Sequence, residues 1–147
     1  MTHSLFSAWQ FQQRCDSWQQ AVRLACLPLA EQGVINGLYA HQIVNATEKL
    51  GPWYILSPGF ALPHARPEEG VICDETHLSL LSLQEGVDFP DHPDIRLIIV
   101  LAAANSTGHI ATIQRLVCWL DKAERLAQLT QISSPAQLHA VLFAHGS

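Results

Sequence analysis

The sequence predicts an α/β fold, a three-layer sandwich in which a central mixed β-sheet is flanked by helices on both faces. Segments with apolar residues at helical spacing precede, interrupt and follow the extended segments. Residues 97–104 form an unbroken apolar run, which is typical of a strand covered on both faces. The 147 residues are 48% hydrophobic and 14% charged, which excludes a disordered chain and a charge-rich coiled coil. We therefore expect residues 1–147 to form one domain.

Two helices are predicted in the first third of the chain. Asp16-Ser17 offers an N-cap for the first, and its apolar residues recur at helical spacing over residues 18–33. Pro28 is expected to kink this helix or end it early, because proline has no N–H to donate. The second helix is predicted from about residue 35 to residue 50, where Gly51-Pro52 stops it.

The strands are expected in the middle of the chain, at residues 53–56, 60–62, 76–83, 87–89 and 95–104. Residues 57–70 are expected to form a stiff loop, since Pro63 and Pro67 keep the residues before them out of the helical region. Residues 88–94 are expected to form a polar turn. Residues 105–108 are read as a loop and cap, followed by a helix from His109, a short helix around residues 126–129 and a last helix capped by residues 133–135.

The charge balance argues against a nucleic-acid binder. Eight Lys and Arg against 13 Asp and Glu give a formal charge of −5, so a broad basic face is not expected. The N-terminus has no basic region and no long apolar stretch, and no apolar run approaches the ~20 residues of a membrane span. We expect a cytoplasmic protein. The four cysteines match no zinc framework and are expected to be buried free thiols, with no metal and no cofactor bound.

His64 is the first candidate for chemistry. It lies at the end of a predicted strand, between Pro63 and Pro67 and two residues before Arg66. The prolines restrict the backbone and lower the entropy lost when the loop orders. A histidine held in this way suits nucleophilic catalysis, general acid–base catalysis or metal ligation. Metal ligation is the weakest of these, because HxxxH and HxH are absent, and a plain loop histidine stays open.

His109 is the second candidate. It follows the long apolar strand and stands beside Gly108 at the predicted start of a helix. A helix N-terminus offers unpaired N–H groups and the positive end of the helix dipole, which suit an anion such as phosphate. Loop ends next to strands are also where α/β folds place their sites. A histidine that merely satisfies its local hydrogen bonds is the alternative.

The segment GFALPHARPEEGV at residues 59–71 resembles a known phosphorylation site. It is similar to that of the IIA component of the bacterial phosphoenolpyruvate-dependent sugar phosphotransferase system, in the mannitol/fructose family. Residues 51–58 and the HARPE sequence look most like the L-ascorbate-type branch of that family. Residues 105–114 resemble the segment that carries the second active-site histidine of the family. The resemblance covers nearly the whole chain.

The resemblance implies a role for each candidate. His64 would become phosphorylated on its tele nitrogen by phospho-HPr and pass the phosphoryl group to a cognate IIB protein or domain, which serves the membrane IIC component. His109 would bind the phosphoryl oxygens or orient the His64 ring. We infer that Arg66 helps to balance the phosphate charge. Two positions depart from the mannitol type: Glu48 stands where those members carry an arginine, and Ala65 stands where they commonly carry a glycine.

Two other functions stay open. A IIA-like regulatory binding module would sense phosphorylation without efficient onward transfer. A metal-dependent hydrolase that uses His64 and His109 is the least favoured. Transient partners would need exposed apolar residues near the site, for which Phe60, Leu62 and Ile110 are candidates, with ordinary core packing as their alternative. Weak self-association of the chain also stays open.

Overall fold

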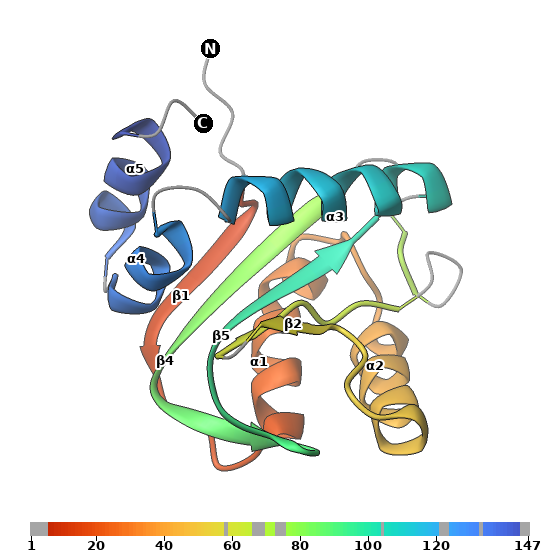
Figure 1. The fold of residues 1–147 in the computed structure, drawn as a ribbon. Coiled ribbons are helices and arrows are strands. Elements are labelled where there is room, and N and C mark those ends of the chain that lie inside the picture. The colour runs from red at the N-terminus through yellow and green to blue at the C-terminus, as the bar shows by residue number, and fades with distance from the viewer. Residues whose placement is uncertain are drawn as a thin grey trace.

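A computed structural model describes residues 6–57, 59–65, 70–72, 76–103, 105–120, 124–132 and 134–144. Within these ranges the strands are β1 (Ala8–Gln13), β2 (Ile55–Ser57), β3 (Phe60–Ala61), β4 (His77–Phe89) and β5 (His92–Ala102). The helices there are α1 (Trp18–Glu31), α2 (Gly37–Leu50), α3 (Ser106–Leu120), α4 (Arg125–Gln131) and α5 (Pro135–Ala144). The strands form one sheet in the order β1-β4-β5-β3-β2 (Figure 1). The pairs β1–β4 and β3–β5 are parallel, whereas β4–β5 and β2–β3 are antiparallel, so the sheet is mixed as predicted.

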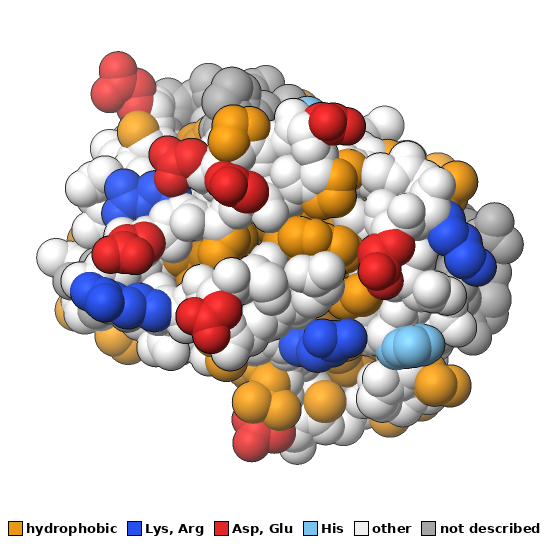
Figure 2. Space-filling view, turned by 90° about the horizontal axis from the view of Figure 1, so that it is seen from below, with side chains coloured by type: hydrophobic (Ala, Val, Ile, Leu, Met, Phe, Trp, Pro, Cys, Tyr) orange, Lys and Arg blue, Asp and Glu red, His pale blue; other side chains and the backbone are white. Residues whose placement is uncertain are grey.

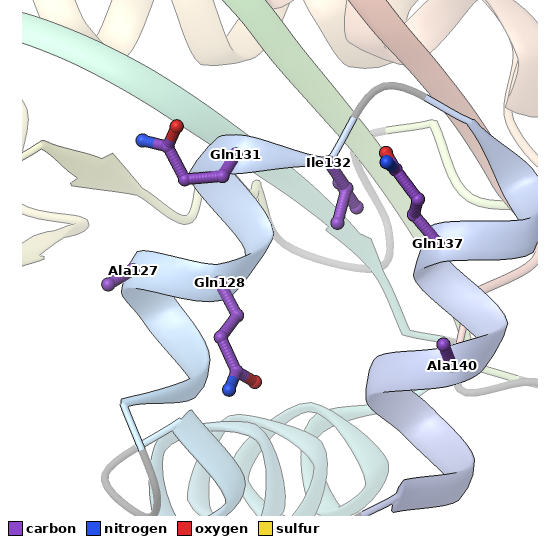
Figure 3. A pocket seen from close by; sticks show the side chains of 6 residues that line it. All are labelled: Ala127, Gln128, Gln131, Ile132, Gln137 and Ala140. Atoms are coloured by element: carbon purple, nitrogen blue, oxygen red, sulfur yellow. The ribbon is translucent and has the colours of Figure 1, made fainter.

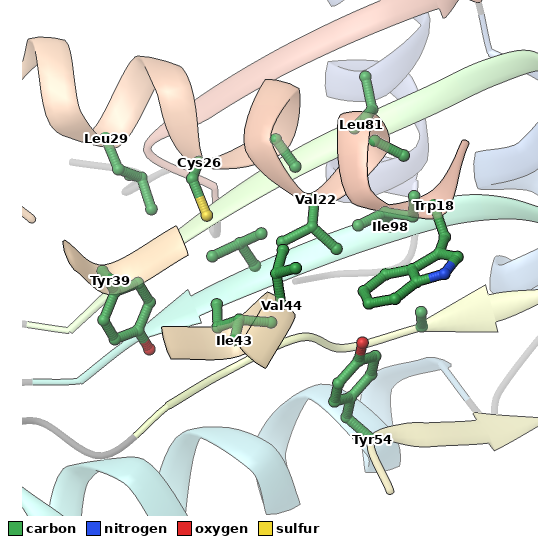
Figure 4. Packing of buried hydrophobic residues seen from close by; sticks show 14 of the residues in the cluster. Trp18, Val22, Cys26, Leu29, Tyr39, Ile43, Val44, Tyr54, Leu81 and Ile98 are labelled. Carbon is green, nitrogen blue, oxygen red and sulfur yellow. The ribbon is translucent and has the colours of Figure 1, made fainter. Parts of the chain in front are cut away.

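Helices cover both faces of the sheet, with α1 and α2 on one face and α3, α4 and α5 on the other (Figure 1). A hydrophobic core lies on each face of the sheet, and successive residues of β5 belong alternately to one core and the other. Ile98, Val100 and Ala102 belong to the core beneath α1 and α2, part of which Figure 4 shows. Leu97, Ile99 and Leu101 belong to the core beneath the other three helices. This alternation confirms a strand that is covered on both faces and the three-layer α/β fold.

The structure adds a strand and extends two others. β1 was not predicted, because its sequence AWQFQQ carries a weak strand signal and its parallel pairing with β4 lies 71 residues away at Ala8↔Ser79. The two segments predicted at residues 76–83 and 87–89 are one strand, β4. The predicted polar turn at 88–94 is shorter than expected, since β5 already begins at His92. Asp91 makes this tight turn with a φ of 61°.

The helix α1 does not end early at Pro28, so that part of the prediction is wrong. Pro28 cannot donate to the carbonyl of Leu24 one turn earlier. The side-chain amide of Gln10 in β1 donates to that carbonyl instead, at 2.8 Å. The hydroxyl of Ser79 in β4 donates to the next carbonyl, that of Ala25, at 2.7 Å. Two side chains of the sheet therefore supply hydrogen bonds beside the proline, and the helix continues.

The cysteines do not all match the expectation of buried thiols. Cys26 is buried and Cys15 is half-buried, but Cys118 on α3 is exposed, so the expectation is wrong for Cys118. Cys73 lies outside the described residues. No helix among the described segments is both long enough and apolar enough to cross a membrane.

Candidate functional site

The segment that carries His64 lies at the carboxyl ends of two parallel strands. β3 pairs with β5 at Ala61↔Ile98, and the chain then continues beside β5 beyond the end of β3. The backbone N–H of Leu101 donates to the carbonyl of Pro63 at 3.1 Å, which places His64 level with the end of β5. Ligand and catalytic groups of α/β folds commonly lie at this edge of a sheet. The loop position predicted for His64 is therefore confirmed.

The hydrogen bonds of the His64 ring define its tautomer. Its Nδ1 lies 2.7 Å from the carbonyl oxygen of Leu62. A carbonyl only accepts, so Nδ1 carries the proton and Nε2 carries a lone pair. The indole N–H of Trp53 points at Nε2 across 3.4 Å, and an N–H can only donate. Both contacts agree on one tautomer, in which Nε2 is the nucleophilic nitrogen.

Two aromatic rings pack edge-on against His64. The ring centroid of Trp53 lies 6.0 Å from that of His64 with an interplanar angle of 87°. The centroid of Tyr54 lies 6.4 Å away at 62°, and the two aromatic rings touch each other at 5.0 Å. These edge-to-face contacts fix the plane of the half-buried imidazole.

The hydroxyl of Tyr39 in α2 forms hydrogen bonds with the backbone beside His64. Its side chain is buried, and its hydroxyl donates to the carbonyl of Leu101 at the end of β5. The same oxygen accepts from the N–H of Ala65 at 3.1 Å and lies 3.3 Å from the Ala65 carbonyl. One hydroxyl thus ties the residue after His64 to the neighbouring strand. Sequence reasoning placed Tyr39 on the apolar side of a helix and did not single it out.

Tyr54 has a structural hydroxyl rather than a reactive one. Thr47 donates to the carbonyl of Ile43 at 2.7 Å, so the Tyr54 hydroxyl donates to Thr47 at 2.8 Å. Burial raises the pKa of Tyr54 to about 12, so its hydroxyl stays protonated near neutral pH. The Tyr54 carbonyl accepts from the N–H of Leu62 at 3.1 Å and holds the strand that leads to His64.

The other predicted site residues are only partly described. The helix α3 begins at Ser106, so residues 106–108 are helical rather than the loop we expected, and His109 lies in the helix instead of opening it. The side chain of His109 and the whole of Arg66 lie outside the described residues. Their predicted roles stay predictions. Glu48 is exposed on α2.

The predicted docking residues divide between the core and the surface. Phe60 and Leu62 are 2% and 1% exposed, so their assignment to a docking surface is wrong, and their side chains fill the core beneath α3. Ile110 is 57% exposed, as that assignment requires. Sequence reasoning missed Trp53, which is 45% exposed. Its position directly after Gly51-Pro52, a pair typical of turns, could have indicated an exposed side chain.

Other parts of the molecule offer less chemistry. Among the described side chains, alanine, glutamine and isoleucine line a groove of about 430 Å³ between α4 and α5, and none of these is titratable (Figure 3). Within the described ranges, no three His, Cys, Asp or Glu side chains converge as metal ligands would. Acidic and basic side chains are interspersed on the face drawn in Figure 2. The His64 edge therefore remains the candidate site.

Comparison with known proteins identifies the family. Residues 7–145 match the family model described as "Phosphoenolpyruvate-dependent sugar phosphotransferase system, EIIA 2". The mannitol-specific cryptic phosphotransferase enzyme IIA component of Escherichia coli K12 is 40% identical over 126 residues, which cover 85% of this chain and 84% of that protein. The ascorbate-specific EIIA component of the same strain is 32% identical over 102 residues, which cover 68% of this chain and 65% of that protein.

A solved structure agrees with these sequence matches. A chain in the complex of enzyme IIA-mannitol with phosphorylated enzyme IIB-mannitol, from Escherichia coli, is 26% identical to this chain. The two superpose with a TM-score of 0.77, over 92% of this chain and 94% of that one. The resemblance stated from the residues around His64 is thereby confirmed. The chain belongs to the EIIA 2 family of the phosphoenolpyruvate-dependent sugar phosphotransferase system and is a phosphoryl-carrying IIA component of sugar transport.

Proposed function

We propose that His64 is the phosphoryl carrier, which accepts its phosphoryl group on Nε2 from phospho-HPr and passes it to a cognate IIB protein. The observation that carries the proposal is the hydrogen bond of 2.7 Å between His64 Nδ1 and the Leu62 carbonyl. This bond leaves the lone pair on Nε2, which is the nitrogen on the side of the exposed Trp53. A carrier needs a nucleophile of that kind on a rigid segment that a second protein can approach.

The transfer balances without a proton release. The lone pair of His64 Nε2 forms the new N–P bond, while the N–P bond of the donor imidazole breaks and its electron pair returns to the donor nitrogen. The His64 ring gains positive charge, which it shares with its Nδ1–H. The Leu62 carbonyl accepts from that N–H and stabilises the charged ring. When a nucleophile of the IIB protein takes the phosphoryl group, the N–P bond at His64 breaks, and its electron pair goes back to Nε2.

His109 and Arg66 are assigned supporting roles within this proposal. His109 binds the phosphoryl oxygens or orients the His64 ring, and the start of α3 at Ser106, five residues beyond Leu101, supports its assignment to the same sheet edge. Arg66 balances phosphate charge, which is needed because Glu48 supplies no cation. We expect His109→Gln and Arg66→Gln to slow labelling of His64 without abolishing it.

Transfer of labelled phosphate tests the first step. Phosphoenolpyruvate, enzyme I and HPr are incubated with the protein, and we expect an acid-labile, base-stable label. His64→Gln should take up none, whereas His41→Gln, a change at an exposed histidine of α2, should be labelled like the wild type. Label in His64→Gln at the wild-type level would remove His64 as the carrier.

Onward transfer tests the second step. The labelled, purified protein is mixed with IIB proteins of mannitol and ascorbate systems, which are chosen because the relatives carry those names. We expect the label to move to at least one IIB protein within seconds to minutes. Retention of the label in the presence of each IIB protein would contradict a transfer role and favour a regulatory module.

A further inference from the structure

Trp53 donates its indole N–H to the very nitrogen that the proposed function assigns as the nucleophile. The donor and acceptor atoms are 3.4 Å apart, so the hydrogen bond is long and weak. Trp53 stands in the turn between α2 and β2, outside the regular elements, and its side chain is 45% exposed. A weak contact to a partly exposed side chain can be exchanged for another at small cost.

We propose that the Trp53 N–H passes from His64 Nε2 to a phosphoryl oxygen when His64 is phosphorylated. This inference rests on the proposed function of His64 and assigns a further residue to the same reaction. In the resting state the indole holds the tautomer that has its lone pair on Nε2. In the phosphorylated state it becomes a neutral hydrogen-bond donor to the transferred group.

The direction of the indole N–H supports this exchange. The N–H points at Nε2, the nitrogen on which the new N–P bond forms. The phosphoryl oxygens, which are strong acceptors, then lie on the side of the ring that faces the indole. The edge-to-face contact of Trp53 with Tyr54, at 5.0 Å and 73°, keeps the indole beside the site.

The negative charge of the phosphoryl group determines whether Trp53 favours the phosphorylated or the resting state. A hydrogen bond to a charged acceptor is stronger than one to a neutral acceptor, so the phosphorylated state gains more from Trp53 than the resting state does. A donor that is already in place costs little reorganisation when the charge arrives. The phosphoryl group brings negative charge to Nε2, so a neutral donor adjacent to that nitrogen has a charge to stabilise.

The equilibrium of phosphoryl transfer tests the inference. Wild type and Trp53→Phe are each equilibrated with HPr and phospho-HPr, and the free and phosphorylated forms of both proteins are quantified. Phenylalanine keeps an aromatic ring at this position and lacks the indole N–H donor. We expect the equilibrium constant for phosphorylation to fall about fivefold, which corresponds to about 1 kcal/mol. Trp9→Phe, a change in β1, should leave the constant unaltered.

The equilibrium constant separates this role from a docking role. An exposed tryptophan that only contacts HPr alters the rates in both directions and leaves the equilibrium between the free proteins unchanged. Unchanged equilibrium in Trp53→Phe, with or without slower transfer, would therefore overturn the inference while the proposed function of His64 stands. Failure of the wild-type protein to take up label on His64 would instead refute the proposed function.

A spectroscopic measurement gives a second readout in the resting protein. We expect the ¹⁵N resonance of His64 Nε2 to shift in Trp53→Phe, because the lone pair loses its donor, while the Nδ1 resonance stays close to its wild-type position. An unchanged Nε2 resonance would contradict the resting hydrogen bond on which the exchange depends.

Discussion

The cores on the two faces of the sheet differ in the hydrogen bonds that their buried side chains make. Beneath α1 and α2 the core contains the buried side chains of Tyr39 and Tyr54 (Figure 4) and of Thr47. Each of their hydroxyl groups has a hydrogen-bond partner. Beneath α3, α4 and α5 the fully buried hydrophobic residues are aliphatic side chains and two phenylalanines, Phe6 and Phe60. The hydroxyl of Ser82, which pairs with Leu97 of this core, is buried and makes no hydrogen bond within the described residues. Hydroxyl groups that bond to specific backbone atoms fix a loop, whereas apolar contacts stabilise without direction. The polar face therefore anchors the His64 segment, and the apolar face contributes stability.

The largest effect on stability is expected from Leu80→Ala in the apolar core. Leu80 of β4 is fully buried, so the lost burial and the cavity should lower the free energy of unfolding by about 3 kcal/mol, as urea denaturation would measure. Labelling of the folded variant should proceed at the wild-type rate. Leu50→Ala is the control, since Leu50 is 78% exposed and should cost little. Slow labelling of folded Leu80→Ala would break the division between the two faces.

Tyr39→Phe is the sharpest test of the polar face. It removes the hydroxyl that bonds Ala65 and Leu101, and we expect a loss of about 2 kcal/mol from the unsatisfied backbone groups. Because the residue after His64 loses its anchor, labelling of the folded variant should also slow, by roughly tenfold. Tyr54→Phe is the matched control, because its hydroxyl bonds Thr47 instead of the loop. Equal labelling rates in the two variants would remove Tyr39 as a positioning residue.

Alkaline pH should act on the polar face as well. Burial raises the pKa of Cys26 and of Tyr54 to about 12, from 9.0 and 10.0. Between those values the unfolded chain has released protons that the folded chain retains. The contribution of these two groups to the free energy of unfolding should therefore be fully present below pH 9 and be lost as the pH rises toward 12. For each group the loss should be about 1.4 kcal/mol per pH unit between its unfolded and folded pKa values.

Denaturation curves at several alkaline pH values measure this slope. Tyr54→Phe should remove its contribution between pH 10 and 12, and Cys26→Ala should remove its contribution between pH 9 and 12. Leu80→Ala, in the opposite core, should lower the whole profile without altering its slope. A slope that persists in the double variant of Cys26 and Tyr54 would place its source elsewhere in the molecule.

The smallest effect concerns the proline in α1. Gln10→Ala removes the donor to the Leu24 carbonyl, and we expect a loss of about 1 kcal/mol. In a Pro28→Ala background residue 28 regains an N–H for that carbonyl, so the same change at Gln10 should cost less. Urea denaturation of the four proteins gives the coupling energy. An equal cost of Gln10→Ala in both backgrounds would show that the amide does not compensate for the proline.

Local patterns in the sequence predicted much of the fold. The capped helix after Ser17, the stop at Gly51-Pro52 and the strand covered on both faces follow from caps, breakers and apolar spacing, all of which act over a few residues. The strand β1 was missed, because its pairing with β4 decides its conformation. The helix α1 was predicted, but its continuation past Pro28 was not, because the compensating donors come from distant strands.

The candidate site divides in the same way. The prolines around His64 and the family motif were enough to single out that histidine and its place at the end of a strand. The tautomer of its ring, the anchor from Tyr39 and the indole of Trp53 depend on atoms that lie 2 to 26 residues away along the chain. Side-chain type sets which hydrogen bonds a residue is able to make, and only the packing of the sheet against α2 determines which partners it meets.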